Sequence, residues 1–199
     1  MSSVTPVESP SAARSLRGAT ARVHADVEAL PHMSALAAGT LAPARYAQVL
    51  RCHLAILAPW ESAHAPWLDA LPAQGWHYRR RAVALRQDLA ALGMALPAMD
   101  GSDVLPAPDH ARAWGMLYVV EGSMLGGRVI ARQLRARQPA LADALAYFDL
   151  GSEDPAAWRR FQGCLDVALR DAASRERAAA GARAMFARFH HHLSVGISA

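Results

Sequence analysis

The sequence predicts an all-α fold that forms a single multi-helix domain. Hydrophobic residues make up 53% of the chain and charged residues only 19%, which is typical of a folded globular protein. Alanine, leucine and arginine dominate, and the alternating β-branched runs that predict strands are absent. A chain of 199 residues can bury a substantial core, and we find no internal repeat or linker. We therefore expect a flexible lead-in over 1–10 and one helical domain over 11–199.

The predicted helices begin and end at breakers and caps. Pro43 lies in a first-turn position, where its missing N–H costs little, and Pro59 should kink or end the same helix. Asp109 can cap a long helix, and Asp154 followed by Pro155 is a cap-and-first-turn signal. We expect helices over 11–30, 33–38, 43–59, 76–92, 109–137, 139–147, 155–172 and 174–193, and a long loop over 94–107.

Composition narrows the classes of function. The net charge of +4 comes from 21 basic residues that are all arginine and are spread along the chain. This distribution argues against nucleic acid and suits a small anionic ligand or an acidic protein partner. No apolar run is long enough to span a bilayer, and the N-terminus lacks the pattern of a secretory signal. Cys52 and Cys164 stand alone, with no metal or disulfide spacing, so we expect a cytoplasmic protein without membrane contact.

One predicted helix contains an unusual glycine cluster. The stretch YVVEGSMLGGRVIAR, residues 118–132, carries Gly122, Gly126 and Gly127 within six positions. Each glycine in a helix costs roughly 1 kcal/mol relative to alanine, so three weaken the segment by about 3 kcal/mol. Three explanations are open: another helix packs very close, a flat ligand lies against the backbone, or the helix must bend.

A second pattern lies in the first predicted helix. His24 and Glu28 are four residues apart and share one helix face. The carboxylate can accept the Nδ1–H of the imidazole, which leaves Nε2 free as a metal ligand. Arg17 lies seven residues earlier on that face and could meet a ligand carboxylate. A surface His–Glu pair on an amphipathic helix is the alternative interpretation. Taken with the glycines, the pattern favours a haem between two helices, with one axial ligand and one open face for oxygen chemistry.

With these two patterns the chain resembles the haem oxygenase family, and its bacterial branch in particular. LRGATARVHADVE resembles the proximal-helix motif, and YVVEGSMLGGRVI resembles the bacterial distal-helix motif. The resemblance extends loosely over residues 15–193. On the proximal side it implies that His24 is the iron ligand, that Glu28 hydrogen-bonds it and that Arg17 neutralises a haem propionate. Met33 and Gly39 fall where the family has a haem-contacting methionine and a glycine.

On the distal side the three glycines match the family's motif, and one residue departs from it. Gly122 and Gly126 match the two key glycines, and Gly127 continues the motif. Mammalian members carry an aspartate directly after the first distal glycine, where it orders water near bound oxygen, but this chain has Ser123. Two further residues, Tyr118 and Arg132, have two interpretations: each could line the pocket, or it could belong to the core or to a solvated face.

The resemblance implies a function and its requirements. Haem b is both cofactor and substrate, and O₂ with electrons from an external donor cleaves it to biliverdin, CO and free iron. Glu28, Gly122, Ser123 and Gly126 would then serve catalysis. The donor would be a ferredoxin or a flavin reductase, and a monomer is the family's default. The alternatives are a non-catalytic haem-binding or haem-sensing protein of the same fold and a helical enzyme of the thiamin-degrading type, which would need a catalytic cysteine with carboxylates.

Overall fold

A computed structural model of the chain describes residues 11–96 and 109–197, and these ranges contain helices, turns and loops but no strand. The α-helices are α1 (Ala12–Glu28), α2 (Pro31–Ala37), α3 (Pro43–Ala63), α4 (Ala65–Ala70), α5 (Arg81–Ala91), α6 (His110–Arg137), α7 (Ala146–Asp149), α8 (Ala157–Ala168) and α9 (Ala172–Gly196). Two 3₁₀ segments, η1 (Leu71–Gln74) and η2 (Pro139–Ala144), follow α4 and α6. The all-α prediction is confirmed. The lead-in predicted over 1–10 and most of the loop predicted over 94–107 lie outside the described residues.

Two long helices begin at the side-chain caps that favour them. Asp109 accepts a hydrogen bond from the Arg112 backbone N–H at 2.9 Å, which confirms the predicted start of α6. Asp171 accepts from the Ser174 N–H at 2.6 Å, and the Ser174 side chain completes a capping box at the start of α9. Each cap satisfies a backbone donor that would otherwise have no partner in the first turn.

Three predicted boundaries are wrong, each for a local reason. α3 continues through Pro59 to residue 63, because it is buried along most of its length and packing outweighs the proline's cost of about 3 kcal/mol. α5 begins at Arg81 rather than Trp76, since Glu61 accepts the Arg81 N–H and ends the preceding extended segment. The helix predicted over 139–147 is split into η2 and α7.

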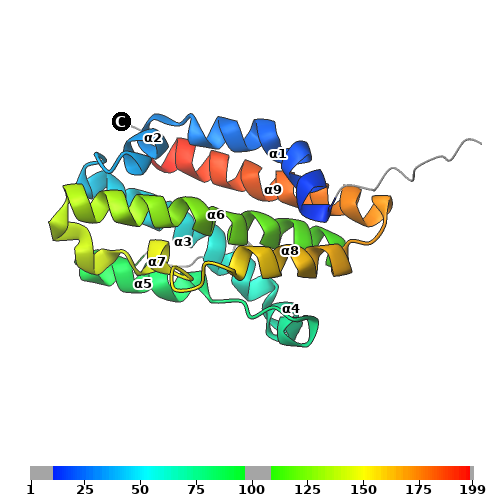
Figure 1. The fold of residues 1–199 in the computed structure, drawn as a ribbon. Coiled ribbons are helices and arrows are strands. Elements are labelled where there is room, and N and C mark those ends of the chain that lie inside the picture. The colour runs from blue at the N-terminus through cyan, green and yellow to red at the C-terminus, as the bar shows by residue number, and fades with distance from the viewer. Residues whose placement is uncertain (1–10, 97–108, 198–199) are drawn as a thin grey trace, which may run out of the picture.

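The long helices form the body of the protein around α6. Figure 1 shows α1, α9 and α6 running along the molecule, with α3 behind them and with α5 and α7 on the far side of α6 from α1. α8 lies beside α6 and also contacts α1. α6 and α9 cross with their backbones in contact: a Cβ added to Gly115 would lie 1.8 Å from the Ala178 carbonyl oxygen. A Cβ on Gly181 would lie 2.2 Å from the Arg112 carbonyl oxygen, so neither position has room for a methyl group.

The far end of α6 is fastened to the chain that follows α2. Gly39 has φ +71°, and a Cβ there would lie 2.8 Å from the Gln133 carbonyl oxygen. The Gln138 amide donates to the carbonyls of Gly39 and Leu41, both at 2.9 Å. Glycine is needed here for both its positive φ and the close approach. No helix among the described residues is long and apolar enough to cross a membrane.

Candidate functional site

The structure separates the three glycines of α6 by what lies next to them. A Cβ on Gly127 would lie 3.2 Å from the Phe148 carbonyl oxygen, so α7 packs tightly there. A Cβ on Gly122 would make only ordinary contact with the Trp158 ring, at 3.5 Å, and one on Gly126 would meet nothing within 4 Å. Close helix packing therefore explains Gly127 but neither Gly122 nor Gly126.

The two unexplained glycines belong to a face of α6 that is held at both ends and exposed between them. Tyr118, Gly122, Leu125, Val129 and Gln133 follow one another at helical spacing along this face. At one end Tyr118 lies beside Arg17 and Thr20 of α1, and at the other Gln133 packs on Gly39. Between them the side chains of Leu125 and Val129 are 45% and 43% exposed. We call this part of α6, about 22 Å of helix, the open stretch.

His24 lies on an exposed face of α1. Its side chain is 54% exposed, and the ring centroid of Phe186, on α9, is 5.2 Å away. The His24 Nε2 lies 3.4 Å from Glu28 Oε1. The predicted pair is present, but the nitrogen that faces the carboxylate is Nε2 rather than the expected Nδ1. Both side chains are more than half exposed, so little besides Glu28 orients the ring.

Arg17 and Tyr118 come together at the first end of the open stretch. Burial raises the pKa of Tyr118, while the Arg17 charge and the hydrogen bond with Thr20 act in the opposite direction. The Trp158 ring packs on Tyr118 with the ring centroids 5.7 Å apart. The structure thus brings a cation of α1 beside a phenol of α6, whereas Arg132, further along α6, is exposed.

The remaining predicted residues occupy different surroundings. Met33 is half-buried and packs against the core, while Gly39 is buried at the junction with Gln133. Ser123 is exposed, and its hydroxyl donates to the Val120 carbonyl at 2.8 Å. Gly127, predicted to bind the cofactor, turns its free side to Phe148 of α7.

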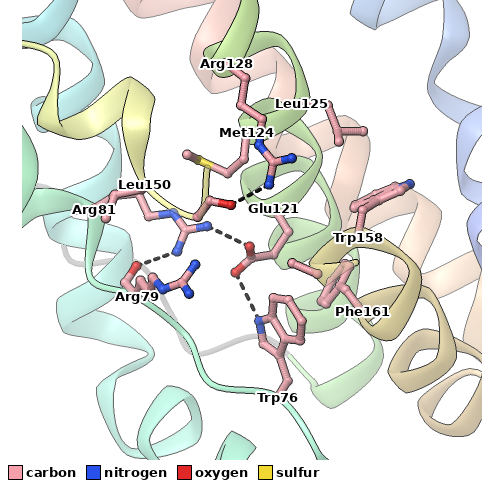
Figure 2. Close-up of a pocket in the computed structure, with 12 residues that line it drawn as sticks. Trp76, Arg79, Arg81, Glu121, Met124, Leu125, Arg128, Leu150, Trp158 and Phe161 are labelled. Carbon is pink, nitrogen blue, oxygen red and sulfur yellow. Dashed lines mark hydrogen bonds and ion pairs between the residues drawn. The ribbon is translucent and has the colours of Figure 1, made fainter. Parts of the chain in front are cut away.

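A buried ion pair stands behind the distal glycines. Figure 2 shows Glu121 between Arg81 and Trp76: its Oε2 accepts from Arg81 at 2.7 Å, and its Oε1 accepts from the Trp76 indole at 3.1 Å. Only 3% of Arg81 and 8% of Glu121 is exposed. Glu121 is thus both buried and ion-paired. These bonds tie the extended segment before α5 to α6.

Sequence reasoning missed three aromatic residues of this region. Phe186 lies beside His24, Trp158 lies over Gly122, and Tyr147 lies beside Ser123. They come from α9, α8 and α7, far along the chain from the residues they touch. Each reads in the sequence as an ordinary apolar position of a helix, so no local pattern could have identified it.

These features define a class of protein: a helical one with an exposed imidazole on α1 and an open, glycine-bearing face on α6. The family model described as Heme oxygenase matches residues 10–194. A curated heme oxygenase from Xanthomonas campestris pv. campestris (strain 8004) is 55% identical over 158 residues, which are 79% of this chain and 94% of that protein. The chain belongs to the haem oxygenase family, and it is accordingly a haem-degrading enzyme.

A solved structure shares the fold. Crystal structures of the NO- and CO-bound heme oxygenase from Neisseria meningitidis superimpose with a TM-score of 0.70, over 95% of this chain and 93% of that one. The sequence identity is 22%, so this likeness concerns the fold alone.

Proposed function

We propose that haem b binds between α1 and α6, with His24 as its one protein ligand, and is cleaved there to biliverdin, CO and free iron. One observation carries the proposal. Gly126 is exposed and has no packing neighbour, yet it costs the helix about 1 kcal/mol relative to alanine. A flat ligand against the backbone accounts for this glycine, and a helix contact does not.

The described residues fit such a group. The His24 imidazole is accessible, and Phe186 lies beside it as an aromatic wall. Leu125 and Val129 offer exposed apolar surface to a porphyrin face. Arg17 beside Tyr118 offers a cation and a hydroxyl to a propionate. When bound, haem supplies both a redox-active iron and the ring carbon that is oxidised.

The residues of the chain then have distinct roles. Glu28 accepts from the imidazole and fixes the orientation of His24. Gly122 and Gly126 let the distal backbone approach closely, so that the space above the ring limits which ring edge reacts. Ser123, which is exposed beside Gly122 in the chain, can hold a water molecule.

The reaction requires O₂ and electrons from outside the chain. The net charge of +4 suits an acidic donor protein, which we infer to be a ferredoxin or a flavin reductase. We further propose that the protein acts as a monomer in the cytoplasm.

A hemin titration tests the proposal. Wild-type protein should give a Soret band that the variant His24→Ala alters, while His110→Ala, an exposed histidine at the start of α6, should bind hemin as wild type does. Reduction with ascorbate or reduced ferredoxin in air should then replace the Soret band with biliverdin absorbance. A Soret band that persists under reduction and oxygen would instead establish the non-catalytic haem-binding alternative. A Soret band that His24→Ala leaves unchanged would contradict the assignment of His24 as the iron ligand.

A further inference from the structure

A small cavity lies beside the open stretch, and its walls bring three arginine side chains together. Figure 2 shows Arg79 and Arg81, from the segment that leads into α5, and Arg128, from α6, around this space. The cavity has a volume of about 30 Å³, which is room for roughly two to three water molecules. Leu125 and Trp158 line it and also border the open stretch. Three cations around so small a space repel one another unless negative charges balance them.

Two of these arginines have a buried donor without an acceptor. The Nε atoms of Arg81 and Arg128 are both shielded from solvent, and neither has a hydrogen-bond partner among the described residues. The whole Arg81 side chain is only 3% exposed. A buried donor on a charged group is costly to leave unpaired, and such groups in folded proteins are normally bonded to protein, water or an ion. Because both residues line one cavity, a single acceptor placed there could satisfy both.

Arg128 is a cation that no carboxylate neutralises among the described residues. Its Nη2 donates to the carbonyl oxygen of Gly151 and to that of Asp154, the latter at 2.9 Å. The Asp154 carboxylate is itself bound to Arg160 of α8. These contacts fix the guanidinium of Arg128 against the loop between α7 and α8, but carbonyl oxygens leave its full charge in place.

The other arginines of the cavity belong to balanced pairs. Arg81 is bound to Glu121 at 2.7 Å, and Arg79 is bound to Glu153 at 2.6 Å. Both carboxylate oxygens of Glu121 already accept hydrogen bonds. The walls of the cavity therefore carry one positive charge in excess, that of Arg128. An anion in the cavity balances this charge, whereas a water molecule does not.

We propose that the cavity is a binding site for a small monovalent anion of the size of formate, which accepts hydrogen bonds from the Nε–H groups of Arg81 and Arg128. Bonds from a guanidinium to an anion are charge-assisted and stronger than those between neutral groups. The excess charge matches one negative charge, and the volume suits an anion of a few atoms. Sulfate, which is larger and divalent, exceeds both. Neither arginine has a part in the proposed haem contacts, so this inference does not depend on the proposed function.

Arginine NMR tests the site in the full chain without haem. Sodium formate is added at constant ionic strength against sodium gluconate, whose anion is too large for the cavity. With ¹⁵Nε-arginine labelling, the Nε–H signals of Arg81 and Arg128 should shift along one saturating curve. The Arg128 signal is assigned by its loss in Arg128→Gln. The Arg81 signal is assigned by its contact with the ring of Tyr78, whose centroid lies 4.6 Å from Arg81 Cζ.

Matched variants separate the cavity from a general effect of charge, with the Arg81 signal reporting binding in each. Arg128→Gln removes the excess charge and one donor, so it should weaken formate binding by about tenfold. Arg183→Gln removes an arginine of α9 that pairs with Glu176 and does not line the cavity, so it should keep the wild-type affinity. Ala157→Leu enlarges a side chain of the cavity wall, leaves both arginines in place and should also weaken binding.

Two results would overturn the anion site. Nε–H signals that do not move with formate, or that move in proportion to its concentration without saturating, would mean that the cavity holds water alone. An affinity that neither Arg128→Gln nor Ala157→Leu lowers would place the formate elsewhere on the protein. Ala157→Leu decides the question if Arg128→Gln loosens the loop between α7 and α8. A wild-type protein that fails to bind hemin would overturn the proposed function and leave the anion site standing.

Discussion

Two regions of α6 contain glycines for opposite reasons. Where α6 crosses α9, Gly115 has the Ala178 carbonyl where a Cβ would be, at 1.8 Å. About three turns further on, Gly126 has nothing within 4 Å. The first region is closed by protein atoms, whereas the second is bounded by α1 at one end and by Gly39 at the other, and is left open between them. The comparison teaches that a glycine in a helix marks close approach without saying what approaches.

The largest expected effect is that of filling the closed region. Gly115→Ala should lower the free energy of unfolding by about 3 kcal/mol or more, because the added methyl group overlaps backbone atoms that cannot rotate away. Denaturant unfolding measures the change. Gly163→Ala, at an exposed position of α8 with no neighbour within 4 Å, is the matched control and should gain about 1 kcal/mol. Equal effects at the two positions would show that the crossing is looser than described.

Two histidines in different surroundings provide the next contrast. The side chain of His24 is 54% exposed, whereas that of His53 is enclosed, and burial, with a smaller effect from His32, lowers the pKa of His53 from 6.5 to about 4. The unfolded chain therefore binds more protons than the folded one between these values. The contribution of His53 to the free energy of unfolding should therefore be fully present above about pH 6.5. The free energy of unfolding should fall by about 3 kcal/mol as the pH decreases to about 4.

Chemical denaturation across this pH range tests the contrast. His53→Leu should remove this part of the acid loss, because it leaves no group to protonate. The exposed control His24→Ala should keep the wild-type loss. An undiminished acid loss in His53→Leu would mean that other buried groups dominate the pH dependence, such as His64, whose pKa burial lowers.

A methyl group added to the open stretch should stabilise the fold but weaken ligand binding. Gly126→Ala should raise the free energy of unfolding by about 1 kcal/mol, since the methyl group meets no protein atom and alanine favours the helix. The same methyl group should weaken hemin binding by about tenfold, or about 1.4 kcal/mol. Thermal unfolding and a hemin titration measure the two quantities. A less stable variant would show that protein atoms close over Gly126.

Local patterns in the sequence account for the helices and for the residues that pair within one helix. Composition and breakers predicted the all-α fold, and the cap at Asp109 is where it was expected. The spacing of His24 and Glu28 predicted their contact, though not which ring nitrogen makes it. Patterns within one helix could not predict Tyr147 beside Ser123, because that contact depends on where α7 packs on α6. The continuation of α3 through Pro59 depended likewise on burial by other helices.

Gly127 lies next to Gly126 in the chain but faces α7, and its expected effect is the smallest. A Cβ there would lie 3.2 Å from the Phe148 carbonyl oxygen, so the neighbour must move by a few tenths of an ångström. The gain of about 1 kcal/mol from helix propensity should be offset by this contact, and Gly127→Ala should change stability by less than about 1 kcal/mol. Hemin affinity should stay at the wild-type value, because this side of α6 faces α7. Weakened hemin binding in Gly127→Ala, measured beside Gly126→Ala, would mean that the packing of α7 on α6 affects the ligand. The open stretch would then extend to this side of α6.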